Sequence, residues 1–169
     1  MHPWTERFSR LDTRRLPSPC FVVDEAAVEE NLQLLNRVQE KSGAKVLLAL
    51  KAFSMWSLGS LVAKYLSGTC ASGVHEAKLG REHFGREVNT YSAAYSEADL
   101  REVLKLSDHV AFNSPGQWKR FRGITQTFPR VKFGLRVNPE HSEGHTALYD
   151  PAAPFSRLGT PRSEIQPRD

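Results

Sequence analysis

A lysine at the end of an apolar run is the residue of this sequence best placed to do chemistry. Lys51 directly follows Val46 to Leu50, all of them hydrophobic. Such a run predicts a strand covered on both faces, which puts Lys51 at the mouth of a hydrophobic sheet. A desolvated lysine amine is a good nucleophile toward an aldehyde and could hold a carbonyl cofactor or substrate as a Schiff base. The alternative, favoured by position alone, is a lysine that reaches water from the strand end.

Two histidines form the other spacing that suggests chemistry. His141 and His145 are four residues apart, and on a helix both imidazoles would share one face and could bind a metal. Pro139 and Gly144 indicate a loop instead, and no zinc signature surrounds the pair. We therefore expect no metal site, and we place both histidines in a loop over the mouth of a pocket.

The elements that must position Lys51 begin with a strand and a helix. Residues 20–23 predict a short strand, and Asp24 is a candidate N-cap for the helix that follows. This helix is expected to end near Gly43. Its apolar stripe consists of Val28, Leu32, Leu35 and Val38.

From here extended and helical segments alternate. The expected strands are 45–50, 69–71, 88–91, 109–112 and 131–137, and the expected helices are 58–66, 74–84, 97–106 and 117–121. Polar residues follow these strands about 20 to 25 positions apart: Lys51, Ser72, Ser92, Asn113 and Asn138. This period is too long for hairpins and is typical of β-α units, so we predict an α/β fold with a parallel sheet.

Parallel β-α units form either a closed (β/α) barrel or an open doubly wound sheet. Neither the G-x-G-x-x-G nor the G-x-x-x-x-G-K-[ST] phosphate loop is present, so the barrel is favoured. A complete barrel typically takes about 250 residues. Only about five units are present, so we expect an incomplete (β/α) barrel.

Length and composition exclude several classes of protein. The chain has 169 residues, which suggests a single domain, and 23 basic against 19 acidic side chains that are scattered along it. Nucleic-acid binding gains no support from this pattern. No apolar run approaches the ~20 residues of a membrane span, and no signal or transit peptide is recognisable, so a cytoplasmic location is expected. Cys20 and Cys70 lack C-x-x-C spacing, and we expect both to be buried reduced thiols.

Residues 48–56, Leu-Ala-Leu-Lys-Ala-Phe-Ser-Met-Trp, resemble the cofactor-lysine motif of the fold type III pyridoxal phosphate enzymes, the alanine racemase and ornithine decarboxylase class. Within that class, Lys51 to Trp56 resembles the carboxynorspermidine decarboxylases, whereas relatives that act on other amino acids usually have asparagine two places after the lysine. Six further segments agree in order: 70–73, 91–95, 112–114, 135–139, 148–151 and 156–159. The resemblance therefore covers about residues 16–160.

The resemblance implies pyridoxal 5'-phosphate as the cofactor and Lys51 as the catalytic residue that binds it covalently until the substrate amine takes its place. Arg136 matches a family arginine close to the cofactor, where a permanent cation can hold negative charge. The alternative is an arginine paired with a carboxylate. Ser72 and His75 follow the second strand near the cofactor in the family. Trp56 could stack on the cofactor, but we expect it to pack within the core.

The family also implies a domain plan and an activity. Residues 1–15 would be a loosely ordered start, 16–160 a partial cofactor-binding barrel of the alanine racemase type and 161–169 a polar tail, with the family's C-terminal β domain absent. The implied reaction is decarboxylation of carboxynorspermidine or carboxyspermidine in polyamine biosynthesis. Full-length relatives are expected to be homodimers, and this chain alone is expected to be nearly inactive. A non-catalytic pyridoxal phosphate homeostasis barrel and an inert truncated fragment remain as alternatives.

Overall fold

The computed structural model describes residues 7–9, 11–144, 146 and 149–165. One parallel sheet has the order β1-β2-β3-β4-β5, so strands that follow one another in the sequence are neighbours in space. The strands are β1 (Leu47–Ala49), β2 (Gly68–Ala71), β3 (Glu87–Tyr91), β4 (His109–Phe112) and β5 (Lys132–Leu135). The predicted parallel sheet of five strands is confirmed.

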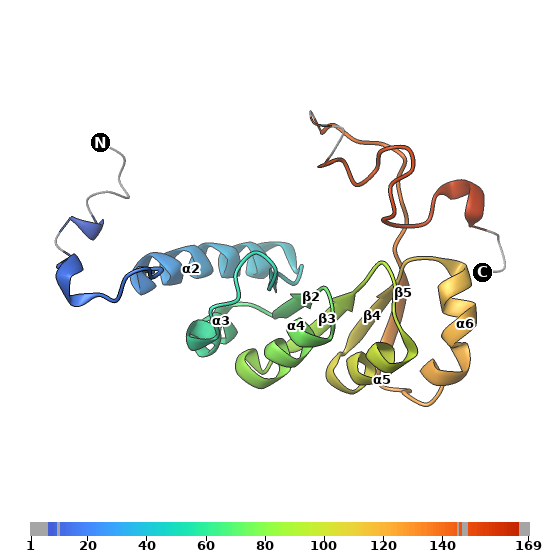
Figure 1. The fold of residues 1–169 in the computed structure, drawn as a ribbon, viewed down its shortest axis with the longest axis horizontal. Coiled ribbons are helices and arrows are strands. Elements are labelled where there is room, and N and C mark those ends of the chain that lie inside the picture. The colour runs from blue at the N-terminus through green and yellow to red at the C-terminus, as the bar shows by residue number, and fades with distance from the viewer. Residues whose placement is uncertain (1–6, 10, 145, 147–148, 166–169) are drawn as a thin grey trace.

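Helices connect the strands and cover one face of the sheet. They are α2 (Glu25–Ser42), α3 (Gly59–Tyr65), α4 (Val74–Leu79) continued by the π-helical η3 (Gly80–Phe84), α5 (Glu97–Leu106) and α6 (Pro115–Thr125). Short 3-10 turns are η1 (Thr13–Arg15), η2 (Trp56–Leu58) and η5 (Arg162–Glu164). Figure 1 shows α3, α4, α5 and α6 in a row along the sheet, with α2 above α3 in this view.

The hydrophobic core lies between the sheet and these helices. Phe112 and Val110 of β4 pack against Leu100 and Val103 of α5, and Phe112 also meets Trp118 of α6 edge to face. Residues on alternate positions of the strands point to the opposite side. This side, here called the open face, is covered by no helix of the described residues, and it is formed by Cys70, Asn89, Tyr91, His109, Ala111, Lys132 and Gly134.

The caps predicted for α2 are present. The Asp24 carboxylate accepts a hydrogen bond from the Ala27 N–H, and Gly43 ends the helix with a φ of 72°. The predicted apolar stripe is only half correct, because Leu32 is buried whereas Leu35 and Val38 are 38% and 49% exposed. The physical reason is position: α2 lies at the β1 end of the sheet, where its main helix neighbour is α3.

Three further expectations are wrong. Residues 20–23 form no strand, because no strand of the described residues lies beside them, and Phe21 is 97% exposed. Both cysteines are free thiols, but Cys20 lies in this unpaired segment and Cys70 lies on the open face, so neither is buried. Trp56 is 63% exposed, and its ring lies 6.4 Å from the His83 ring between centroids, because Leu58 is the residue of η2 that is buried.

The chain beyond β5 adds one more parallel contact to the sheet. Val137 and Thr160 form a single parallel bridge, in which the Asn138 N–H donates to the Thr160 carbonyl oxygen at 2.8 Å. Figure 1 shows the intervening segment, coloured orange to red, rising from the sheet before it returns toward α6. None of the described helices combines the length and the apolar character that a membrane span requires.

Candidate functional site

The polar residues that follow the strands share one edge of the sheet. All five strands are parallel, so their carboxyl ends lie on the same side. Lys51, Ser72, Asn113 and Arg136 each come one or two positions after such an end. Ligand sites of α/β barrels are built from these ends and the loops behind them. The carboxyl edge is therefore the candidate site.

Lys51 stands in a tight turn at the end of β1. Leu50 is buried and donates its N–H to the Cys70 carbonyl oxygen, and the N–H groups of Ala52 and Phe53 both donate to the Ala49 carbonyl oxygen. The turn holds the backbone of Lys51 firmly, but its side chain is exposed. The expected desolvation is thus not found, because β1 is an edge strand of the described sheet and no strand lies on its other side. No hydrogen bond or ion pair within the described residues engages the Lys51 amine.

Cys70 is the charged amine's neighbour on the open face. The residue pairs in register with Ala49, two positions before Lys51. Burial by surrounding atoms raises the pKa of the Cys70 thiol, and the positive charge of Lys51 acts in the opposite direction. The register of β1 and β2 therefore places Cys70 close to the strand end that carries Lys51.

Arg136 lies over an aromatic ring at the same edge. Its guanidinium carbon is 4.6 Å from the centre of the Tyr91 ring. The Tyr91 hydroxyl donates to Asn113 Oδ1 at 2.6 Å. The Arg136 backbone is held on both sides, by the Phe112 carbonyl oxygen and the Thr160 N–H. Within the described part of the chain Arg136 has no carboxylate partner, so the ion-pair alternative finds no support there.

Ser72 and His75 follow β2 as expected, but Ser72 already has partners. Its N–H and hydroxyl donate to the two carboxylate oxygens of Glu76 at 2.8 and 2.7 Å, an arrangement that fixes the start of α4. His75 is exposed in the first turn of that helix. A contact of either residue with a cofactor stays a prediction.

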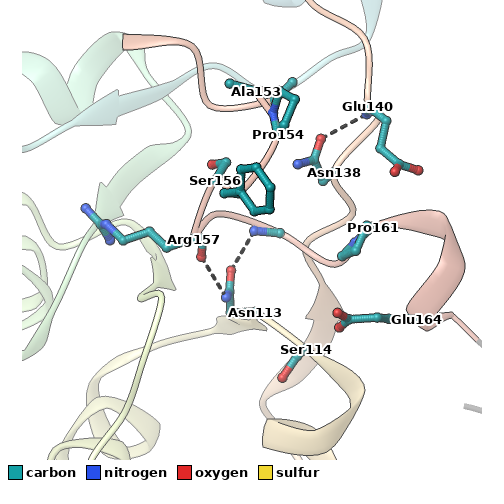
Figure 2. A pocket seen from close by; sticks show the side chains of 13 residues that line it. Asn113, Ser114, Asn138, Glu140, Ala153, Pro154, Ser156, Arg157, Pro161 and Glu164 are labelled. Atoms are coloured by element: carbon teal, nitrogen blue, oxygen red, sulfur yellow. Dashed lines mark hydrogen bonds between the residues drawn. The ribbon is translucent and has the colours of Figure 1, made fainter. Parts of the chain in front are cut away.

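A hollow of about 560 Å³ opens beyond the ends of β4 and β5 (Figure 2). Asn113 forms its floor and binds the returning segment three times. Its Oδ1 accepts from the Gly159 N–H at 2.7 Å, its Nδ2 donates to the Arg157 carbonyl oxygen at 3.0 Å, and its carbonyl oxygen accepts from the Thr160 hydroxyl at 2.8 Å. Asn138 lines the same hollow, is 8% exposed, and accepts from the Glu140 N–H.

Sequence reasoning did not assign roles to Tyr91 and Asn113. Their place at the ends of β3 and β4 was the available signal, but the contact between them depends on strand register. His141 lies exposed in a loop, as expected, and His145 lies outside the described residues. Among the residues that are described, no group of three or more His, Cys, Asp or Glu side chains could hold a metal.

Comparison with known proteins places this sheet within a class of decarboxylases. No family model matches the chain. The structure of carboxynorspermidine decarboxylase from Campylobacter jejuni, complexed with norspermidine, superposes on 91% of the chain with a TM-score of 0.79 and 36% identity. Diaminopimelate decarboxylase from Helicobacter pylori superposes on 92% with a TM-score of 0.71 and 20% identity, which shows the fold alone. The fold is a partial α/β barrel of the fold type III decarboxylases.

The sequence relatives narrow this class. Carboxynorspermidine/carboxyspermidine decarboxylase of Herminiimonas arsenicoxydans is 43% identical over 85% of the chain, and carboxyaminopropylagmatine decarboxylase of Synechocystis is 42% identical over 85%. The chain spans 39% and 37% of the length of these two proteins. Over the part that it spans, the chain is homologous to the carboxynorspermidine/carboxyspermidine decarboxylases.

Proposed function

We propose that the chain carries the lysine-bearing part of a pyridoxal-phosphate-dependent decarboxylase that acts on carboxynorspermidine or carboxyspermidine in polyamine biosynthesis. The observation that carries the proposal is Lys51, which stands with a free amine at the carboxyl end of β1. The homology to decarboxylases named for these substrates supports the substrate class.

The residues present fit the aldehyde end of this cofactor. Covalent attachment needs an accessible amine, and the Lys51 side chain is exposed at the carboxyl end of β1. A flat ring needs space beside that amine. The open face offers a shallow cavity of about 270 Å³, which begins at Cys70, the register partner of Ala49, and extends across the sheet to Ala111 and Gly134. A Cβ built on Gly134 would meet no atom within 4 Å, so this part of the open face has room for a ring.

When bound, pyridoxal phosphate supplies an electron-accepting ring for the electrons that remain after carbon dioxide leaves. Lys51 would hold the cofactor by a bond from its amine to the aldehyde carbon and would release that bond when the substrate's amine takes its place. The released Lys51 amine can then hold or deliver a proton beside the reacting carbon. Arg136, a permanent cation at the same edge, would pair with an anionic group of the bound molecules.

Borohydride trapping tests the assignment of Lys51. The purified chain is incubated with pyridoxal phosphate, reduced and mapped by peptide mass spectrometry. We expect the label on Lys51, its loss in Lys51→Ala and its retention in Lys64→Ala, a matched control because Lys64 is also an exposed lysine. Label found mainly on Lys41, Lys45 or Lys64 would contradict the assignment.

Competition during trapping tests the substrate class. Carboxynorspermidine added before reduction should displace the Lys51 bond and lower the labelling of Lys51, whereas L-lysine at the same concentration of amino groups should lower it less. Equal effects of the two amines would overturn the substrate assignment while leaving the cofactor assignment intact. Release of carbon dioxide, compared with a cofactor-only control, then measures the decarboxylation that this chain supports by itself.

A further inference from the structure

Three residues from three different strand ends form a connected group at the carboxyl edge. Arg136 follows β5, Tyr91 ends β3 and Asn113 follows β4. The guanidinium carbon of Arg136 is 4.6 Å from the Tyr91 ring centre, and the Tyr91 hydroxyl donates to Asn113 Oδ1 at 2.6 Å. Asn113 thus fixes the ring on which the arginine rests.

Asn113 is itself held from the other side. Its Oδ1 also accepts from the Gly159 N–H, and its Nδ2 donates to the Arg157 carbonyl oxygen. Both the oxygen and the nitrogen of the Asn113 side-chain amide are therefore engaged, with backbone atoms and the Tyr91 hydroxyl. The Tyr91 ring cannot turn away without breaking a hydrogen bond in this set, so its position is determined by the fold and not by the arginine alone.

The stacking restricts an otherwise flexible side chain. A free arginine side chain samples many rotamers, and ordering it on binding opposes affinity. A guanidinium resting on a ring face keeps its N–H groups along its own edge, where they remain available for an anionic oxygen. No carboxylate of the described residues pairs with Arg136, so its donors are not taken up by an ion pair in that part of the chain.

We propose that Tyr91, held by Asn113, is a positioning residue for Arg136: it fixes the guanidinium so that its N–H donors meet an anionic oxygen group of the molecule bound at the carboxyl edge. This inference rests on the proposed function for its ligand. The oxygen group is either the phosphate of the cofactor or the carboxylate of the substrate. Both accept paired hydrogen bonds from a guanidinium.

The geometry can be tested without any ligand. The Tyr91 ring should shift the side-chain NMR resonances of Arg136, which are assigned by comparison with Arg136→Lys. Tyr91→Leu should abolish this ring-current shift, and Tyr91→Phe should keep most of it. Tyr65→Phe is the matched control, because Tyr65 also donates its hydroxyl to a side chain, Glu29 Oε1 at 2.6 Å, but does so in the helical layer. An Arg136 signal that is the same in wild type and Tyr91→Leu would overturn the proposal.

Affinity measurements test the positioning role. Pyridoxal phosphate binding is followed by absorbance, and we expect Tyr91→Leu and Arg136→Ala each to weaken it about tenfold, as loss of a cation–π-oriented contact predicts. Their combination should weaken binding no further, because Tyr91 acts through Arg136. Tyr65→Phe should bind as wild type does. Circular dichroism checks that each variant is folded. If Tyr91→Leu unfolds, Tyr91→Phe replaces it, and its affinity for pyridoxal phosphate should fall by at most about threefold.

The probes separate the two sources of the oxygen group. If Arg136→Ala and Tyr91→Leu lose affinity for pyridoxal phosphate but not for pyridoxal, Arg136 contacts the phosphate. If, in the competition assay, the same variants show weaker competition only by carboxynorspermidine, and not by norspermidine, Arg136 contacts the substrate carboxylate. Two outcomes would overturn the positioning role of Tyr91. One is a double variant whose losses of affinity add up, and the other is unchanged affinity in all variants while Lys51 is still labelled. Absence of any label on Lys51 would instead contradict the proposed function, and with it the ligand named here.

Discussion

Asn113 at the end of β4 accepts a hydrogen bond from the N–H of Gly159, 46 residues further along the chain, at 2.7 Å. The same side chain donates to the Arg157 carbonyl oxygen. These two bonds anchor the returning segment over the carboxyl edge, where the hollow of Figure 2 lies. A single amide therefore connects the sheet, the loop above it and, through Tyr91, the candidate arginine.

Asn113→Leu should loosen this segment. The substitution leaves the Gly159 N–H and the Arg157 carbonyl oxygen without their partners, at a cost of about 2 kcal/mol in the free energy of unfolding. Urea denaturation measures the loss, and limited trypsin digestion should cut faster after Arg157. Asn31→Leu, an exposed change on α2, should alter neither. Equal digestion rates in wild type and Asn113→Leu would contradict the anchoring role.

Gly159→Ala should destabilise the same segment through the backbone. Gly159 has a φ of 82°, and a Cβ there would lie 2.9 Å from the Asn138 nitrogen and 3.0 Å from the Val137 carbonyl carbon. We expect a loss of about 1 to 3 kcal/mol in thermal or urea unfolding. Gly123→Ala is the control: it lies inside α6 with open space around it, and it should stabilise the chain by about 0.5 to 1 kcal/mol. A neutral Gly159→Ala would contradict the geometry.

Asp108→Asn should reduce the acid sensitivity of the fold. Burial raises the pKa of Asp108, but hydrogen bonds from the Val88 N–H and Arg81 outweigh it and leave that pKa below its usual value. A carboxylate with a lowered pKa stabilises the folded chain above its unfolded pKa, and this contribution is lost as the pH falls through the folded value. The free energy of unfolding of the wild type should therefore fall below about pH 4 more steeply than that of Asp108→Asn.

The size of this effect is limited by exposure. The side chains of Arg81 and Asp108 are 37% and 46% exposed, so their ion pair contributes about 1 kcal/mol at most and less at high salt. Glu143→Gln, in an exposed loop, serves as the control and should follow the wild-type pH dependence. Parallel pH curves for wild type and Asp108→Asn would disprove the assignment.

Leu100→Ala should lower the free energy of unfolding much more than the same substitution at an exposed leucine. Leu100 of α5 is completely buried against β4 and α6, so its truncation leaves a cavity worth about 2 to 5 kcal/mol. Leu34→Ala on α2 removes the same atoms from an exposed position and should cost less than about 1 kcal/mol. Urea unfolding compares the two. Similar losses in both variants would mean that the core does not lie where the structure places it.

The local pattern of the sequence was enough to predict most elements. The segments 97–106 and 109–112 match α5 and β4 at both ends, and the caps Asp24 and Gly43 bound α2 as expected. Caps and periodic apolar residues act over a few positions, so they can be read without knowing the neighbours in space. The regular β-α period likewise predicted that the strands are parallel.

What depended on neighbours in space was decided only by the tertiary structure. The sequence 20–23 is apolar enough for a strand, but a strand needs a partner, and no strand of the described residues lies beside it. Burial of Leu35 and Val38 likewise depends on a surface to cover them. The support of Arg136 by Tyr91 and Asn113 requires three strands in one register. Contacts between residues far apart in the chain are set by packing, which no local pattern encodes.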